Sequence, residues 1–182
     1  VVYHYHENAF VKGTFYKVLA TIMQKLAHKI ICVSEYQASF LQQKKCVITV
    51  PNALPQNFVN RLTPNFQAAF KRKHILMLGS LKLYKSPLEF IELTKRLPQF
   101  IFVLVINDTK ENINIFIKEY KINISKNLTI YPQQNDVVPF YNQTSLVLNL
   151  SNKKQFVETF GLTALEAMSA GLPVIVPTEG GI

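Results

Sequence analysis

Short runs of mostly apolar residues alternate along the chain with longer amphipathic segments, and this alternation restricts the fold more than any other feature. Runs such as Lys29–Val33, His74–Gly79 and Phe100–Ile106 read as strands. Strands that are apolar throughout and joined by helices are typical of a parallel sheet buried on both faces. We therefore predict an α/β fold with doubly wound parallel sheets. The predicted strands are Val1–His6, Lys29–Val33, Val47–Val50, His74–Gly79, Phe100–Ile106, Leu128–Ile130, Leu146–Leu150 and Pro173–Val176.

Between these runs, hydrophobic residues recur at intervals of three and four positions, which is the pattern of one apolar helix face. The longest such stripe consists of Phe15, Val18, Leu19, Ile22, Met23 and Leu26. Further helices are predicted over 88–95, 113–120 and 162–170.

The segment 51–73 breaks the pattern, since it contains Pro51, Pro55 and Pro64, several asparagines and no regular period. We predict a linker there, between the end of a first Rossmann-like domain (1–50) and a second one (74–182). The chain begins without Met and stops directly after a strand-like run. We therefore expect it to be an internal fragment of a longer protein, with both domains incomplete.

The chain carries 20 Lys and Arg residues against 11 Asp and Glu, and this net charge of +9 favours anionic partners. A hydrophobic share of 48% supports a packed core and argues against disorder. The basic residues are scattered, and we interpret the densest cluster, Lys71-Arg72-Lys73, as a solvated loop. No known recognition motif accompanies the charge, so we expect no nucleic-acid binding.

Compartment and membrane contact are indicated only indirectly. Cys32 and Cys46 show no metal-ligand spacing, which favours a reducing, cytoplasmic compartment. No apolar run reaches the roughly 18 residues of a membrane span. A basic, amphipathic helix over 12–29 leaves peripheral contact with the inner membrane surface open, although such a stripe more often packs on a protein core.

The stretch 158–177 contains the most informative candidate residues. A polar loop, Ser151–Gln155, follows a predicted strand, and a helix is expected to begin near Gly161. In open α/β sheets, ligands bind beyond the carboxyl ends of the strands, where the unpaired N–H groups of a helix start attract phosphate. Glu158 and Glu166 would then accept hydrogen bonds from hydroxyl groups, which a nucleotide sugar supplies. Two solvated glutamates on a surface helix are the alternative.

The two glutamates, the Phe-Gly between them and the following Ala-Met-Ser-Ala-Gly-Leu-Pro-Val together resemble the signature of glycosyltransferase family 4, whose members have the GT-B fold. The resemblance implies that Glu158 contacts the transferred sugar and that Glu166 binds the ribose hydroxyls. It also implies that the backbone amides of Phe160, Gly161 and Leu162 face the donor.

A second match to this family begins at the end of a predicted strand, with Gly79, Ser80 and, five residues later, Lys85. The family has Gly-Arg-Leu and then Lys-Gly there, and the Arg and Lys neutralise the diphosphate. In this chain Ser80 replaces the Arg and Ser86 replaces the Gly. Lys82 is the candidate for the missing charge. These departures weaken the expected diphosphate clamp without removing it.

Two further matches lie near the ends of the chain. Gly180 and Gly181 resemble a glycine turn that lies near the donor in this family, with an ordinary turn as the alternative. His6 ends the first predicted strand, where the family has a histidine that faces the donor sugar across the cleft. His4 shares its side of the strand but lies farther from the end. A surface histidine is again the alternative.

The resemblance implies a retaining, hexosyltransferase-like enzyme of the kind found in polysaccharide biosynthesis. It would move a sugar from a nucleotide diphosphate sugar to an unidentified glycan, lipid-linked or small-molecule acceptor. No Asp-x-Asp element is present, so we expect no metal and no other cofactor, with Lys85 and the helix start stabilising the leaving diphosphate.

The sequence is also compatible with two other classes of function. The first is a non-catalytic nucleotide-sugar-binding protein of the same fold, which the Ser80 departure permits. The second is a dinucleotide oxidoreductase. We disfavour it because Gly79 stands alone after its strand, without the Gly-x-Gly-x-x-Gly pattern.

Overall fold

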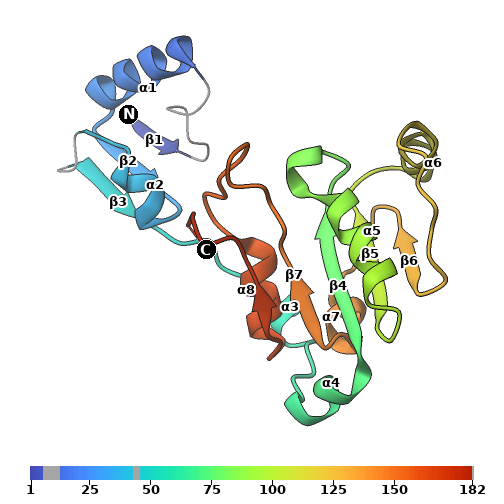
Figure 1. Ribbon diagram of the computed structural model, residues 1–182. Helices are drawn as coiled ribbons and strands as arrows, with labels where there is room; N and C mark the ends of the chain where they lie inside the picture. The colour runs from blue at the N-terminus through green and yellow to red at the C-terminus, as the bar shows by residue number, and fades with distance from the viewer. Residues whose placement is uncertain (6–12, 43–45, 182) are drawn as a thin grey trace. The chain divides into compact units, whose positions relative to one another are not determined.

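The computed structural model of the chain describes residues 1–5, 13–42 and 46–181, and Figure 1 shows its helices and strands. These residues form two compact units. Unit 1 consists of the described residues of 1–53, 157–162 and 179–182, and unit 2 consists of 54–156 and 163–178.

Unit 1 is built on a three-stranded parallel sheet in the order β1-β2-β3. Its elements are β1 (Val2–Tyr5), α1 (Thr14–Leu26), β2 (Lys29–Cys32), α2 (Glu35–Ser39) and β3 (Val47–Thr49). Alternate residues of β2, Ile30 and Cys32, are buried with Tyr5 and Leu41 in one small core. Burial, together with the nearby Glu35, raises the pKa of the Cys32 thiol to about 11. The thiol therefore stays protonated and packs as a small apolar group.

Helix α1 has the predicted apolar stripe, but the stripe is exposed in the described part of the chain. Phe15, Val18 and Leu26 leave 75%, 53% and 64% of their surface accessible, whereas Ala20 and Gln24 are buried. The packing of this stripe on a core is therefore not observed. None of the helices that the structure describes is long and apolar enough to cross a membrane.

Unit 2 is built on a five-stranded, all-parallel sheet in the order β6-β5-β4-β7-β8. Its strands are β4 (His74–Gly79), β5 (Ile101–Ile106), β6 (Leu128–Tyr131), β7 (Leu146–Leu148) and β8 (Val174–Ile175). Its helices are α3 (Gln56–Val59), α4 (Phe66–Arg72), α5 (Pro87–Arg96), α6 (Lys110–Glu119), α7 (Val138–Gln143) and α8 (Leu162–Ser169), with a 3₁₀ turn, η3 (Leu83–Lys85). The chain adds strands on one side of β4 and then, from β7, on the other. The topological switch point therefore lies between the C-terminal ends of β4 and β7.

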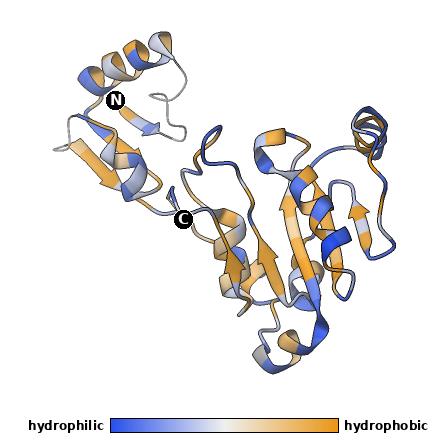
Figure 2. Ribbon diagram, viewed as in Figure 1, coloured by the Kyte–Doolittle hydropathy of each residue, from blue (hydrophilic) through white to orange (hydrophobic). Residues whose placement is uncertain are grey.

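The sheet of unit 2 packs on both faces, as its mostly apolar strands require. Successive residues of β4 point to opposite faces. Leu76 packs in one core with α7 and α8, whereas Ile75 and Met77 pack in the other with α5 and α6. In Figure 2 these strands are hydrophobic along most of their length, and the helices carry hydrophilic residues as well.

The predicted α/β architecture is confirmed. All eight predicted strands are present, to within one or two residues at their described ends. The predicted linker over 51–73 is not uniformly irregular, because α3 and α4 form within it. Asn65 caps the start of helix α4, because its side chain accepts a hydrogen bond from the backbone N–H of Ala68 at 2.9 Å. Helix α7 has no counterpart among the predicted helices.

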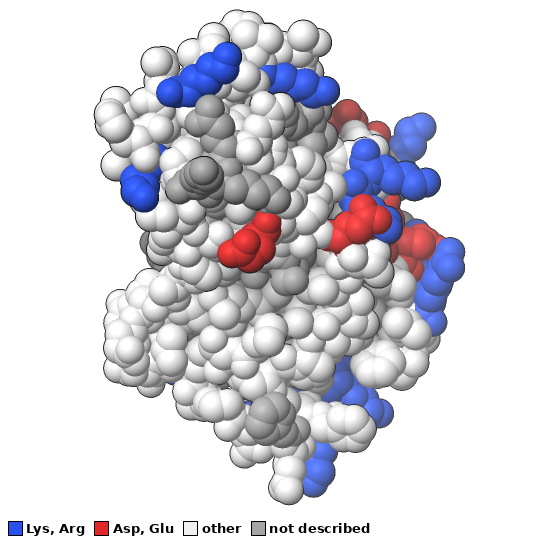
Figure 3. Space-filling model, turned by 90° about the vertical axis from the view of Figure 1, so that its left-hand side faces the viewer, with Lys and Arg blue, Asp and Glu red and all other residues white. Residues whose placement is uncertain are grey.

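The basic cluster at 71–73 ends a helix and does not form the expected solvated loop. Arg72, in the last turn of α4, donates a hydrogen bond to the carbonyl oxygen of Asn142. Lys73 adopts a left-handed backbone with φ 57°, which ends the helix. Basic side chains there complement the negative end of the helix dipole. On the face shown in Figure 3, Lys and Arg side chains lie at separate points and do not form one patch.

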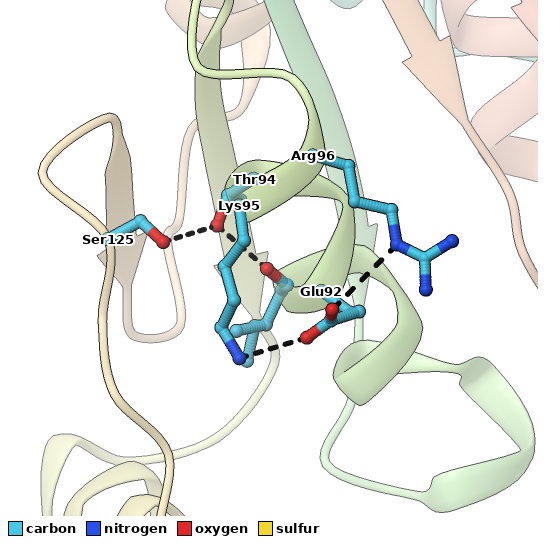
Figure 4. A network of polar contacts seen from close by, with 6 residues as sticks. Glu92, Thr94, Lys95, Arg96 and Ser125 are labelled. Atoms are coloured by element: carbon cyan, nitrogen blue, oxygen red, sulfur yellow. Dashed lines mark hydrogen bonds and ion pairs between the residues drawn. The ribbon is translucent and has the colours of Figure 1, made fainter.

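An exposed polar network on α5 shows how a glutamate behaves at an ordinary surface position (Figure 4). Lys95 and Arg96 pair with Glu92 at 2.9 and 3.8 Å. Beside this network, the hydroxyl oxygens of Thr94 and Ser125 are hydrogen-bonded at 2.8 Å. Lys95 lowers the pKa of Glu92, but solvent screens such exposed pairs and limits their contribution to stability. Glu92 is therefore a suitable control for the candidate glutamates.

Candidate functional site

Two loops meet at the topological switch point of unit 2, which is where open α/β sheets bind their ligands. The first follows β4 and leads into η3, and the second follows β7 and runs to Phe156. The backbone N–H of Asn152, in the second loop, donates a hydrogen bond to the carbonyl oxygen of Tyr84, in the first, at 2.7 Å. The two loops are therefore directly joined.

Lys85 is half-buried at this junction. Its ammonium nitrogen lies 4.8 Å from the ring centroid of Phe156 and 5.8 Å from that of Tyr84, within the range of cation–π attraction. The turn that carries Lys85 ends at Ser86, which is buried and has φ 57° and ψ 44°. Glycine adopts this left-handed backbone without strain, which explains why the glycosyltransferase family 4 pattern has Gly at the position of Ser86. The serine keeps the same turn.

The residues on either side of η3 complete the first loop. Gly79 is the last residue of β4, and Ser80 follows it with a neutral, half-buried hydroxyl group. Lys82 adds a second positive charge to that of Lys85, with its ammonium nitrogen 5.7 Å from the ring centroid of Tyr84. Two lysines on this loop therefore face the same aromatic ring.

In unit 1, the segment 157–162 is held by residues that are distant in the sequence. Ser34, at the start of α2, donates its hydroxyl proton to the carbonyl oxygen of Thr159 at 2.6 Å and accepts from the backbone N–H of Gln37 at 3.1 Å. The N–H of Gly181 donates to the carbonyl oxygen of Glu158 at 2.8 Å. The backbone beside the Glu158 side chain is therefore fixed at two points.

Both glycines of the predicted turn pack closely on this segment. Gly180 has φ +132°, and a Cβ atom there would lie 2.8 Å from the carbonyl oxygen of Glu158. A Cβ atom at Gly181 would overlap the carbonyl oxygen of Thr159 and would lie 2.5 Å from the hydroxyl oxygen of Ser34. The turn is thus a close approach of two backbones that leaves no room for a side chain.

Glu166 is half-buried on α8 and contacts α7. Tyr141, which is 0% exposed, donates its hydroxyl proton to Glu166 Oε2 at 2.5 Å. Burial raises the pKa of Glu166, and the hydrogen bond from Tyr141 acts in the opposite direction. Burial and the adjacent carboxylate also raise the pKa of Tyr141, so its phenol remains a donor. The tyrosine thus fixes one oxygen of the carboxylate.

The raised pKa of Glu166 predicts a pH-dependent contribution to stability. Above the ordinary carboxyl pKa of 4.5, the folded protein keeps a proton that the unfolded chain has lost. The contribution is therefore fully present below that pKa and is lost as the pH rises through the folded value. In urea titrations, the free energy of unfolding of wild type minus that of Glu166→Gln should fall as the pH rises above the ordinary carboxyl pKa of 4.5. A difference that increased with pH would contradict the raised pKa.

The predicted residues fall into three local groups. The groups are Glu158 with Gly180 and Gly181 in unit 1, Gly79 with Ser80 and Lys85 in unit 2, and Glu166 on α8. Of the predicted amide donors, Phe160 is half-buried, Gly161 is buried and Leu162 begins α8. His6 lies outside the described residues.

Across the described part of the chain, no three His, Cys, Asp or Glu side chains gather in a way that suits a metal ion.

Four contact residues were not identified from the sequence as parts of a site: Ser34, Tyr84, Tyr141 and Phe156. In the sequence, Tyr84 comes directly before Lys85, and Phe156 comes two residues before Glu158. An aromatic residue so close to a candidate residue could have been predicted as part of the site. Ser34 lies 125 residues before Thr159 in the sequence, so its contact with that residue had no local signal. Tyr141 gave no signal, because α7 itself was not predicted.

Comparison with known proteins identifies the family of the chain. Residues 61–182 match the family model described as "Glycosyl transferases group 1". No curated protein sequence matches the chain significantly. The match covers both loops at the switch point and the whole of α8.

Several solved structures share the fold. A glycosyltransferase from Rickettsia africae has a TM-score of 0.68 and 16% identity over 91% of this chain and 49% of its own. WaaG, a glycosyltransferase involved in lipopolysaccharide biosynthesis, has a TM-score of 0.67 and 18% identity over 99% of this chain and 57% of its own. A variant of TarM from S. aureus, in complex with fondaparinux, α-GlcNAc-glycerol and UDP, has a TM-score of 0.69 and 16% identity over 98% of this chain and 37% of its own.

The chain therefore spans between 37% and 57% of the length of these structures. Identities this low show a common fold, which is the Rossmann-like α/β fold of GT-B type predicted from the sequence. Because the family model covers the greater part of the chain, the chain belongs to the group 1 glycosyltransferases.

Proposed function

We propose that this chain is part of a retaining glycosyltransferase of family 4, which transfers a sugar from a nucleotide diphosphate sugar to a glycan, lipid-linked or small-molecule acceptor. The observation that carries the proposal is the junction at the switch point of unit 2, where Lys85 lies between the loop after β4 and the loop that leads to Glu158. The UDP in the TarM complex supports a nucleoside diphosphate donor.

Each candidate residue has a role in this proposal. Glu158 contacts and orients the transferred sugar, without acting as a nucleophile, and His6 faces the same sugar. Glu166 accepts hydrogen bonds from the ribose hydroxyls. The amides of Phe160, Gly161 and Leu162 face the donor. The close approach at Gly180 and Gly181 keeps the Glu158 segment in place, and Gly79 and Ser80 border the diphosphate.

The positive charge for the leaving diphosphate comes from the protein in this proposal. Lys85 and Lys82 lie on the loop after β4, and the first turn of α8 carries backbone N–H groups that have no acceptor within the helix. Such groups stabilise the negative charge that develops on a leaving diphosphate. We therefore propose a metal-independent transfer. Chelator treatment should leave the rate unchanged.

The proposed compartment is the cytoplasm. Peripheral contact with the inner membrane surface would involve the exposed stripe of α1, which includes Phe15, Val18 and Leu26. Lys17 and Lys25 on the same helix add positive charge, which anionic lipid attracts.

Donor binding tests the assignment of Glu166. With its carboxylate removed, the ribose hydroxyls lose an acceptor in both the ground state and the transition state, so the loss appears in KM. In the full-length enzyme, Glu166→Ala should raise the donor KM by about ten- to a hundredfold, since hydrogen bonds to charged groups contribute roughly 1.5–3 kcal/mol. Initial rates with uridine, guanosine and adenosine diphosphate sugars would identify the donor and measure the change. An unchanged KM would refute the role of Glu166.

A non-catalytic nucleotide-sugar-binding protein of the same fold is not favoured by the family match. Titration calorimetry separates the two functions. Donor binding without sugar release from any nucleotide sugar would identify the non-catalytic protein, whereas turnover would establish the transferase.

A further inference from the structure

Two aromatic side chains stack on each other at the switch point of unit 2. The rings of Tyr84 and Phe156 have centroids 4.7 Å apart and planes inclined by 22°. Tyr84 comes from the loop after β4 and Phe156 from the loop after β7. Both side chains are half-buried, and neither belongs to the core clusters formed by the described residues of unit 2. The contact therefore joins two loops and does not fill the core.

Two ammonium groups lie against this aromatic pair. Lys85 Nζ is 4.8 Å from the Phe156 centroid and 5.8 Å from the Tyr84 centroid, and Lys82 Nζ is 5.7 Å from the Tyr84 centroid. All three distances fall within about 6 Å, where the negative face of an aromatic ring attracts a cation. Each ring therefore restricts a side chain that would otherwise sample many rotamers.

The geometry points to a positioning role for the pair. We propose that Tyr84 and Phe156 hold the Lys85 ammonium at the switch point, in place to receive a nucleoside diphosphate. Lysine needs such support more than arginine does, because its single charge sits on a flexible stem without a rigid donor fork. At Ser80, where the resembling pattern has an arginine, this chain has only a hydroxyl group. The aromatic pair would thus restore part of the order that an arginine fork provides.

This inference rests on the proposed function, because it assigns a diphosphate to the Lys85 site. The position of the Lys85 ammonium can also be measured without a ligand. If Phe156 holds the ammonium, ¹³C-methyl groups placed on Lys85 by reductive dimethylation should show ring-current-shifted NMR signals. The shift should become clearly smaller in Phe156→Leu, where only the more distant Tyr84 ring remains, and it should persist in Phe156→Trp.

The binding test uses UDP, GDP and ADP with the full-length enzyme, each compared with its nucleoside. For the diphosphate that binds best, the ratio of nucleoside Kd to diphosphate Kd measures the contribution of the two phosphates. Phe156→Leu should lower this ratio by about three- to tenfold, and Phe156→Trp should restore it. Adding Phe156→Leu to Lys85→Ala should cause little further loss, because both substitutions remove the same interaction.

A matched control loses an aromatic ring elsewhere. Phe116 on α6 and Tyr120, the residue directly after α6, have ring centroids 4.6 Å apart, and Phe116→Leu should leave both the Lys85 signals and the Kd ratio unchanged. An unshifted Lys85 signal in wild type, or a Kd ratio that Phe156→Leu does not change, would overturn the inference while the proposed function stands. If wild type binds no nucleoside diphosphate, the proposed function fails, and the positioning role fails with it.

Discussion

Glu158→Ala in the full-length enzyme is expected to lower kcat by about 10²–10³-fold, with a much smaller change in the donor KM. In the proposed site this carboxylate touches the sugar being transferred, so its contact matters most when charge moves in the transition state. The Glu166 carboxylate, by contrast, would touch a part of the donor that does not react. The two substitutions should therefore separate into a kcat effect and a KM effect, measured as initial rates over a range of donor concentrations.

Two variants control this experiment. Glu158→Gln keeps the size of the side chain and removes its charge, so a similar loss would assign the effect to the carboxylate. Glu92→Ala removes a glutamate from the exposed network of α5, where Lys95 and Arg96 are its partners, and should change neither kcat nor KM. A Glu158→Ala enzyme with normal kcat would refute the role of this residue.

The strands were the most predictable part of the fold, for a physical reason. A parallel strand that is buried on both faces needs an unbroken apolar run, and this requirement is visible in the sequence itself. His74–Gly79 was predicted with the bounds that the structure has for β4. Helix α7 was missed because it has six residues with Pro139 in its first turn, too few for a periodic pattern to appear.

Residues of the candidate site could be predicted from the sequence in only two situations. In the first, the backbone conformation favours one residue type, and in the second, a charged side chain follows a strand. Gly180, with φ +132°, is such a position, and Lys85 was identifiable as a charge after a strand. Ser86 was noted as a departure, but the left-handed turn that the serine preserves was not visible in the sequence. The contact of Tyr141 with Glu166 joins two helices, and sequence spacing does not define such a contact.

Gly181→Ala is expected to lower kcat by about ten- to a hundredfold while the protein remains folded. The added methyl group would overlap the carbonyl oxygen of Thr159 and crowd the hydroxyl of Ser34. Backbone shifts that relieve such crowding cost roughly 1–3 kcal/mol. The segment that must move carries Glu158, whose carbonyl oxygen accepts the Gly181 N–H at 2.8 Å. A small displacement there would remove the proposed sugar contact from its working position.

Gly13→Ala distinguishes this steric effect from the general cost of replacing a glycine. Gly13 also has a positive φ, of 107°, but a Cβ atom there would meet no atom of the described residues within 4 Å. The control should therefore lose some stability through backbone strain and keep its kcat. Thermal unfolding measures the loss of stability in both variants, and initial rates measure the loss of kcat. Equal losses of kcat would mean that the contact of the glycine turn with the Glu158 segment has no catalytic consequence. A loss in Gly181→Ala alone would show that catalysis depends on how closely these two backbones approach.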